Sequence, residues 1–440
     1  MEWRADARAR DSHKDMIDCV SGLTGVQVSR RVVVTGLGMI TPLGHNACDN
    51  WEAMRQGVSG IARISNFDPA GFGSTVAGEV KAFDPTKFMD RKDARRADRF
   101  TQFAFAAAQE ALRHSGFVIP EGEGKDVVTI VGTAIGGITT LMEEYDTMVA
   151  KGPSRVSPFL VPMMLPDMAS GHLSIKLGAR GVNYSLVSAC ASGADCIGEA
   201  SNIIRRGDAE VAIAGGAEAA VTPIVVAGFV AAKALSQNPD AGTASRPFDA
   251  LRDGFILAEG AGMLVLESEE HALARGATIL AELAGYGATS DAFHITQPEE
   301  HGEGAIRAMS LALERSGLAP DDVDYINAHG TSTPLNDRQE TMAIKKLFGD
   351  YAYTLPISST KSMTGHSLGA AGAIEAGVCV MAMQHGIIPP TIHLRQADPA
   401  CDLDYVPNVA RSASLQAVMT NSFGFGGHNA SLVFRRYEPK

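Results

Sequence analysis

The chain has 440 residues, of which 45% are hydrophobic and 20% charged, and its formal net charge is −12. This length is sufficient for one large or two medium domains with ample core, and the acidic balance argues against a general nucleic-acid-binding protein. The six cysteines show neither a CxxC pair nor regular spacing, which argues against a disulfide framework or a zinc site and favours a reducing cytoplasm.

The N-terminal residues 1–29 mix arginines with aspartates and lack the apolar core of a secretory signal. We expect them to form a disordered extension. Elsewhere no uninterrupted apolar run approaches the ~18–20 residues that a membrane helix needs, so no membrane association is expected.

The densest basic cluster of this acidic chain lies between Phe83 and Phe100. Arg91, Lys92, Arg95 and Arg96 recur at spacings that would place them on one side of a helix. Most charge runs are simply solvated helix faces, but against the acidic background this one is also a candidate docking patch.

An Ala-rich amphipathic helix is predicted next, at Thr101–His114, followed by a strand at Val127–Thr133 that ends in a glycine turn. The segment Pro153–Pro166 is rich in proline and methionine. We expect it to form an irregular lid or subunit-contact loop.

A strand–turn–helix–strand pattern then runs from Val182 to Gly216, with the first strand at Val182–Val187 and Cys190 on the turn. A thiol at a helix N-terminus lies near unpaired N–H groups and the positive end of the helix dipole. This position predicts a Cys190 pKa lowered from about 8.5 toward neutrality. A lone cysteine is equally often a small buried hydrophobe, so position alone leaves a catalytic and a structural interpretation open.

Beyond residue 275 the alternation of strands and helices starts again. Strands are predicted at residues 281–286, 323–327, 356–359, 417–422 and 430–434, and helices at 305–316, 338–347 and 369–383. The repeated element order predicts an α/β protein of two similar halves. We place the halves at residues 30–276 and 277–440.

The second half carries two histidines that follow predicted strands, His329 and His366, with Lys361 shortly before the second. Taken singly, each histidine is more readily a structural residue, and a lone lysine is more often solvated than catalytic. Together with the thiol of Cys190 they form a constellation that fits cysteine chemistry on an acyl carbonyl without a metal. The small-residue helix that follows contains Glu375, a buried charge that needs a cationic partner such as Lys361.

Five segments carry a resemblance to a known family: VSACASG, NAHGTSTP, SSTKSMTGH, LGAAGAIE and NSFGFGG, in this order between Val187 and Gly427. They resemble the β-ketoacyl-acyl carrier protein synthases of the thiolase-like superfamily, above all the type II condensing enzymes of fatty acid synthesis (KAS II). The resemblance covers Arg30 to Arg436. It implies a five-layer αβαβα thiolase-like fold built from two similar halves, a homodimer, an acyl carrier protein as partner, and neither cofactor nor metal.

The resemblance also implies a reaction, the decarboxylative Claisen condensation of malonyl-acyl carrier protein with an acyl chain held on Cys190. Each round would lengthen a fatty acid by two carbons. The implied site residues fall into five groups. They are the catalytic set Cys190, His329, His366 and Lys361; the oxyanion hole formed by the backbone N–H groups of Cys190 and Phe425, with Phe425 also acting as a gate; the network residues Glu340 and Glu375; the substrate-binding residues Thr331, Thr333, Ile135, Phe229 and Phe423; and the carrier-docking residues Lys92, Arg95, Arg96 and Arg155.

Four alternatives compete with this interpretation. A cysteine protease or hydrolase would need one histidine with an orienting Asn or Asp, and not two histidines with a lysine. A thiolase would carry a second cysteine in the C-terminal glycine loop, where this chain has Phe425. A non-catalytic chain-length partner subunit would lack the nucleophile, and Cys190 is present. A ketosynthase of a type II polyketide system would share all the motifs, so it stays open as the alternative.

Overall fold

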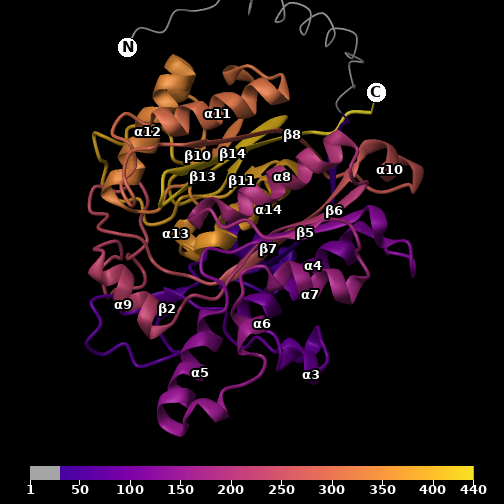
Figure 1. Ribbon diagram of the computed structural model, residues 1–440. Helices are drawn as coiled ribbons and strands as arrows, with labels where there is room; N and C mark the ends of the chain where they lie inside the picture. The colour runs from indigo at the N-terminus through magenta and orange to yellow at the C-terminus, as the bar shows by residue number, and fades with distance from the viewer. Residues whose placement is uncertain (1–29, 440) are drawn as a thin grey trace, which may run out of the picture.

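The computed structural model describes residues 30–439, so the predicted extension of residues 1–29 lies outside the described residues. A ten-stranded sheet runs through the molecule in the order β10-β9-β13-β14-β8-β1-β7-β6-β4-β5 (Figure 1). Five strands come from the first half of the chain and five from the second. They are β1 (Val32–Ile40), β4 (Val127–Gly132), β5 (Asn183–Tyr184), β6 (Val211–Glu218) and β7 (Gly260–Ser268), then β8 (Ala281–Ser290), β9 (Tyr325–Asn327), β10 (Ile357–Ser358), β13 (Ala417–Gly424) and β14 (His428–Arg435).

The two halves share one topology, which confirms the predicted repeat. In each half the strands, counted along the chain, lie in the order third, second, fourth, fifth, first. The second strand pairs in parallel with the third and fourth, whereas the fourth–fifth and fifth–first pairs are antiparallel. A short antiparallel contact between β1 and β8, at Val33 and Val34, joins the halves.

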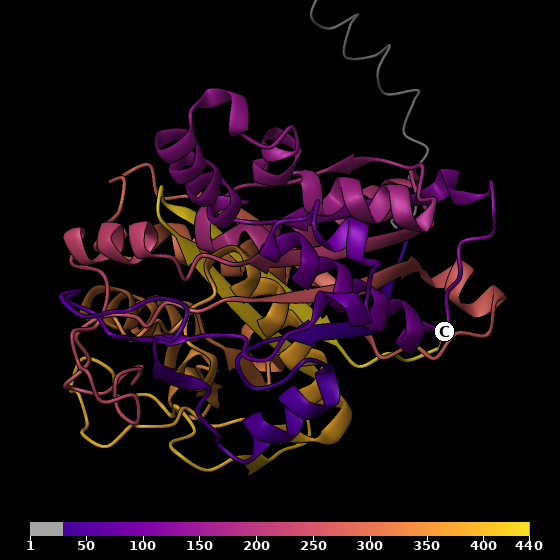
Figure 2. The same cartoon turned by 90° about the horizontal axis from the view of Figure 1, so that it is seen from below.

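Helices cover the sheet in layers, as Figures 1 and 2 show. α4 and α7 pack on the outer face of the first half, α11 and α12 form the outer layer of the second, and α8 and α14 lie between the halves. This is the predicted five-layer αβαβα arrangement. The helices are α2 (Ala47–Arg55), α3 (Arg91–Ala94), α4 (Arg99–Ser115), α5 (Ile138–Lys151), α6 (Leu160–Met164), α7 (Met168–Leu177), α8 (Ser192–Arg206), α9 (Pro223–Ala231), α10 (Glu269–Ala274), α11 (Glu303–Ser316), α12 (Pro334–Phe348), α13 (Lys361–Thr364) and α14 (Ala371–His385); two small ribbons pair β2 (Ile61–Arg63) with β3 (Val76–Gly78) and β11 (Ile387–Ile388) with β12 (Arg411–Ser412).

The central pair of helices packs backbone against backbone, as the small residues of α14 predict. A Cβ on Gly372 would lie 2.9 Å from the backbone nitrogen of Ala194 in α8, and one on Gly193 would lie 3.0 Å from the nitrogen of Ala373. Every residue of α14 from Ala371 to Met383 is buried. This close contact brings the turn before α8, with Cys190, against residues of the second half.

Two local predictions are wrong. The strand at Val182–Val187 shrinks to the two residues of β5, because only Asn183 and Tyr184 pair with β4, and the chain leaves the sheet before the turn at Ser188. The basic cluster does not form one helix face either. Asp90 caps α3 and Asp98 caps α4, so that two N-caps eight residues apart divide the run.

Within residues 30–439, no helix combines the length and the apolar character needed to cross a bilayer. The boundary between the halves at residue 276, just before β8 begins at Ala281, stays a prediction.

Candidate active site

Cys190 lies in a 3₁₀ turn, Ala189–Ala191, immediately before α8. The turn is tight, with Ala189 in the left-handed region at φ 51°. Hydrogen bonds hold it: the Ser192 hydroxyl donates to the carbonyl of Ala189 at 2.7 Å, and the Ser188 hydroxyl donates to the carboxylate of Asp195 on α8. The nucleophile candidate is therefore carried by a braced turn and not by a mobile loop.

His329 follows β9 directly, as predicted. The buried carboxylate of Glu340 on α12 accepts hydrogen bonds from the backbone N–H groups of His329 and Gly330, both at 2.8 Å. Glu340 therefore acts on the backbone that carries the imidazole. Burial raises the pKa of Glu340 to about 7, although these N–H groups pull it back in part.

His366 follows α13 and Gly365, which has a positive φ of 74°. Its backbone N–H donates to the carbonyl of Ile256 at 2.7 Å, and its carbonyl accepts from the N–H of Ala258 at 2.9 Å. A segment of the first half thus clamps the second imidazole in place.

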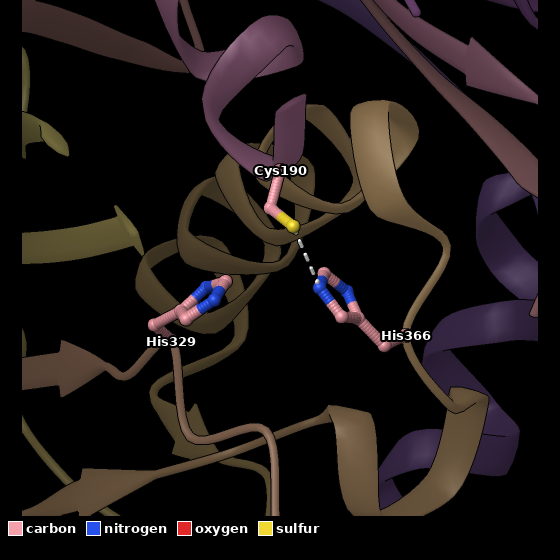
Figure 3. Close-up of side chains that lie close together, drawn as sticks. All are labelled: Cys190, His329 and His366. Atoms are coloured by element: carbon pink, nitrogen blue, oxygen red, sulfur yellow. Dashed lines mark hydrogen bonds between the residues drawn. The ribbon is translucent and has the colours of Figure 1, made fainter. Parts of the chain in front are cut away.

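Figure 3 shows the sulfur of Cys190 pointing between the two imidazole rings, which approach from opposite sides. Nε2 of His366 lies 3.1 Å from Sγ of Cys190. The ring centroids of His329 and His366 are 5.3 Å apart, with the planes at 86°. Two histidines, each more than 130 positions after Cys190 in the sequence, therefore converge on its sulfur, as the sequence predicts.

Lys361 and Glu375 form a buried ion pair behind this site. Their exposed fractions are 1% and 2%, and Nζ of Lys361 donates to Oε1 of Glu375. Of the two candidate carboxylates named from the sequence, Glu375 is thus the one bound to Lys361. Burial raises the pKa of Glu375 to about 7, against the opposing charge of Lys361.

The protonation of the site differs from the sequence prediction. Burial raises the pKa of Cys190 to about 12, and the charge of Lys361 and the backbone N–H of Phe425 offset this only in part. Burial and the charge of Lys361 hold the pKa values of His329 and His366 well below their usual range. The prediction of a thiol pKa near neutrality is wrong because desolvation of the thiolate outweighs the helix dipole. At neutral pH the site is a thiol between two neutral imidazoles.

A cavity of about 630 Å³ opens over these groups. Apolar and aromatic side chains form much of its wall, and the ring of Phe425, 37% exposed, lies 6.3 Å from that of Phe229. The cavity brings together the residues that the sequence assigns to catalysis, to the gate and to substrate binding, while their roles stay predictions. The lining includes Cys190, His329, His366, Ile135, Phe229, Thr331, Thr333, Phe423 and Phe425.

The same three side chains could hold a metal ion, since Sγ of Cys190 and one ring nitrogen of each histidine all lie within 4.8 Å of one another. However, Nδ1 of His329 and Nδ1 of His366 have no hydrogen-bond partner among residues 30–439. Histidines that bind metals generally donate their second ring N–H to an acceptor. The sulfur and the two ring nitrogens fit a soft divalent ion, but neither histidine has the second hydrogen bond that would hold its ring in place as a metal ligand.

The predicted docking residues lie on the surface rather than in the cavity. Lys92, Arg95 and Arg155 are exposed, whereas Arg96 is partly covered and stacks on the ring of Phe159 at 4.2 Å. Their shared helix face does not exist, because α3 ends at Ala94.

Sequence reasoning missed two carboxylates near the site, the buried Glu218 and the partly buried Asp195. Asp195 accepts hydrogen bonds from Ser188 and, at 2.8 Å, from the hydroxyl of Tyr286. Glu218 accepts from the turns on both sides of the cavity. The available signal for Glu218 was a charged residue directly after the apolar run Val211–Ala217.

Comparison with known proteins agrees with this geometry. Family models described as β-ketoacyl synthase, N-terminal and C-terminal domains, match residues 29–272 and 280–395. The 3-oxoacyl-acyl-carrier-protein synthase 2 of Synechocystis sp. is 51% identical over 410 residues, which are 93% of this chain and 99% of that protein.

Two solved structures are also similar. One is the ishigamide ketosynthase/chain length factor, with a TM-score of 0.88 and 38% identity. The other is AntDE:AntF, a type II polyketide synthase acyl-carrier protein in complex with its ketosynthase bound to the hexaketide, with a TM-score of 0.87 and 34% identity. Each match covers 93% of this chain and 100% of the other. Matching domains, half-identical relatives and the shared fold agree: the chain belongs to the β-ketoacyl synthase family of condensing enzymes.

Proposed function

We propose that this protein elongates acyl chains carried on an acyl carrier protein by decarboxylative Claisen condensation with malonyl-acyl carrier protein. The observation that carries the proposal is the convergence of one thiol and two neutral imidazoles on a cavity of about 630 Å³. The half-identical relative named 3-oxoacyl-acyl-carrier-protein synthase 2 supports the choice of substrates.

In the first half-reaction the sulfur of Cys190 attacks the thioester carbonyl of the acyl-carrier protein. Because a thiol of pKa about 12 is protonated at neutral pH, its proton must leave as the carbon–sulfur bond forms. Nε2 of His366, 3.1 Å away, is placed to accept it and to pass it to the leaving pantetheine thiol. The products are an acyl-Cys190 thioester and a free carrier thiol.

In the second half-reaction malonyl-carrier protein loses CO₂ and the electrons of the broken bond form an enolate. His329 donates a hydrogen bond from its ring N–H to the enolate oxygen, and His366 donates a second one from Nε2 after it has exchanged to the tautomer with the proton on Nε2. The carbanion attacks acyl-Cys190, which releases the β-ketoacyl product and a Cys190 thiolate, and the thiolate takes up one proton from solvent. Neutral imidazoles suit this task, since each ring can donate from a fixed position without a charge of its own.

The backbone N–H groups of Cys190 and Phe425 form the oxyanion hole in this scheme, each contributing about 3–4 kcal/mol to transition-state binding. The N–H of Phe425 points at the sulfur of Cys190. Gly426 and Gly427, both with positive φ, follow the ring and give the backbone the freedom for a gate. Phe229 flanks the same entrance.

The remaining cavity residues contact the substrate. Thr331 and Thr333, whose hydroxyls lie 3.0 Å apart, are assigned to the pantetheine arm. Ile135, which lines the cavity, is assigned to the acyl end of the substrate, and the ring of Phe423 lies 5.8 Å from the ring of His329.

The carrier protein is assigned to the exposed cations Lys92, Arg95 and Arg155, with Arg96 beside them. A chain of net charge −12 repels an acidic partner at long range, so a local basic patch is required for docking. The solved ketosynthase with its acyl-carrier protein supports a carrier as partner. The homodimer and the cytoplasmic location stay predictions, as does a reaction without cofactor or metal.

A polyketide ketosynthase is the second candidate, because one of the similar structures described above is a type II polyketide synthase complex and the other is a ketosynthase/chain length factor. Their identities of 34% and 38% are lower than the 51% shared with the 3-oxoacyl-acyl-carrier-protein synthase 2. We therefore favour fatty acid elongation.

Mass spectrometry of the intact protein tests the proposal. Mixed with acyl-carrier thioesters of graded chain length, the protein should gain one acyl group on Cys190, and malonyl-carrier protein should then yield a product two carbons longer. Acyl loading on another residue, or no loading with any saturated chain, would refute the assignment. Preference for a poly-β-keto chain over saturated chains would favour the polyketide candidate.

A further inference from the structure

A buried carboxylate that the mechanism does not use lies at the end of β6. Glu218 is fully buried, and two separate turns donate hydrogen bonds to it. From the turn after β4 come the hydroxyl of Thr133 at 2.9 Å and the N–H groups of Ala134 and Ile135 at 2.7 and 3.3 Å. From the turn that leads into α14 comes the N–H of Gly369 at 3.1 Å.

The two turns also touch directly. A Cβ on Gly369 would lie 2.3 Å from the backbone nitrogen of Ala134, so the two backbones are in contact at this point. Both turns line the cavity, the first through Ile135 and the second through Leu368. Leu368 holds a left-handed φ of 45°, a conformation that surrounding contacts must maintain in a residue other than glycine.

The second turn is connected to the site itself, because Leu368 lies two residues after His366. One carboxylate therefore binds the wall of the acyl pocket and the backbone that continues from the imidazole nearest Cys190. If the turn after β4 moves, Glu218 loses up to three of its four hydrogen bonds, and if the Gly369 turn moves it loses the fourth.

We propose that Glu218 is a positioning residue that fixes the Ile135 wall against the His366–Gly369 turn, and that the stiffness of this wall sets how sharply the enzyme rejects acyl chains longer than its pocket. The proposal rests on the proposed function, since it concerns the substrate of the same site. Burial raises the pKa of Glu218 to about 7, and the hydrogen bonds that its carboxylate accepts from the two turns offset this in part.

Glu218→Gln weakens the contact with one turn and keeps the contact with the other, with little change in the size of the side chain. An amide oxygen in the place of Oε2 keeps the bonds from Ala134 and Gly369. The amide nitrogen then replaces Oε1, where the Thr133 hydroxyl can rotate to accept but the N–H of Ile135 loses its acceptor. The variant should therefore loosen the pocket wall while the His366 turn stays held.

The experiment measures kcat/KM for loading of Cys190 across a series of acyl-carrier thioesters. In Glu218→Gln the ratio between the best chain and the first rejected longer chain should fall about three- to tenfold, the equivalent of one lost hydrogen bond. The rate with short chains, which do not reach Ile135, should stay within twofold of wild type.

Glu110→Gln is the matched control. Glu110 lies on the outer helix α4 and also accepts two backbone N–H groups, from Met39 and Ala47, at 3.0 and 2.7 Å. It should leave the chain-length profile unchanged. If Glu218→Gln does not fold, Thr133→Val serves instead, because it removes one hydrogen-bond donor to the same carboxylate. It should also lower the ratio of kcat/KM between the best chain and the first rejected longer chain.

An unchanged profile in the Glu218 variant, an equal loss at all chain lengths, or the same blunting in Glu110→Gln would overturn the proposal. Failure of the wild-type protein to load any acyl chain would instead refute the proposed function, so the two results are distinguishable.

Discussion

Replacing Lys361 by methionine should destabilise the protein strongly, because it leaves Glu375 buried without its cation. Glu375 is 2% exposed, and its second oxygen, Oε2, has no partner among the described residues. Removing one partner of such a pair costs about 3–5 kcal/mol, most of it the desolvation of the remaining charge. Lysine and methionine have similar length, so a cavity contributes little.

The pH dependence gives this prediction a sign. The pKa of Glu375 is raised to about 7 in the folded protein, so the folded state holds its proton between pH 4.5 and 7 and stability falls as pH rises through that window. Without Lys361 the pKa of Glu375 rises further, so the free energy of unfolding of the variant continues to fall at higher pH. The difference between variant and wild type should therefore be small at pH 5 and near its full value at pH 9.

Urea denaturation followed by tryptophan fluorescence at both pH values measures this difference. The control is the double variant Lys361→Met, Glu375→Leu, which removes both charges and should recover most of the lost stability. A loss below 1 kcal/mol at pH 9, or a double variant as unstable as the single one, would refute the reasoning from the buried pair.

Three further predictions follow from the site and the core. His366→Ala should slow acyl loading of Cys190 by about 10²-fold or more. The loading rate of this variant should also rise about tenfold per pH unit up to pH 9, because a thiol of pKa about 12 then loses its proton only to solvent. A loading rate in stopped-flow measurements that is independent of pH would contradict this prediction. Gly372→Val should unfold the protein or lower its thermal midpoint by more than 10 °C, since a Cβ there lies 2.9 Å from the nitrogen of Ala194; calorimetry showing a normal midpoint would place α14 elsewhere. Arg95→Glu should raise KM for carrier-bound substrates more than for pantetheine analogues, whereas equal effects on both would remove this exposed cation from the docking surface.

The sequence predicts the architecture well because its cues are local and repeated. Apolar strands and small-residue helices recur in the same order in both halves, and the motifs identify the reactive centre of the cavity, although much of its lining comes from segments outside them, such as residues 232–234, 253–255 and 296–298. The failures have a different origin. The prediction that Lys92 and Arg96 share one helix face is wrong because Asp90 and Asp98 cap two separate helices.

The protonation of Cys190 could not be predicted from its position in the chain. The turn before α8 was correctly located, and the dipole argument is sound for an exposed helix end. What decides the pKa is burial by segments distant in sequence, among them the Phe425 loop and the His366 turn. Glu218 escaped notice for the same reason, since its partners come from turns 83 to 151 residues away.

One charge, that of Lys361, acts in the same favourable direction on three neighbours. It adds to burial in lowering the pKa values of His329 and His366, which favours neutral rings, and it lowers the pKa of Cys190 against the effect of burial. A neutral ring is needed both to take the thiol proton and to donate to the enolate, and a less basic thiolate forms more readily. Lys361→Met should therefore move the acid limb of the loading rate to higher pH as the imidazoles become easier to protonate, and should slow loading at pH 7 as the thiol becomes harder to ionise. An acid limb that stays in place, in a variant shown to be folded at that pH, would mean that the cation serves only to hold Glu375.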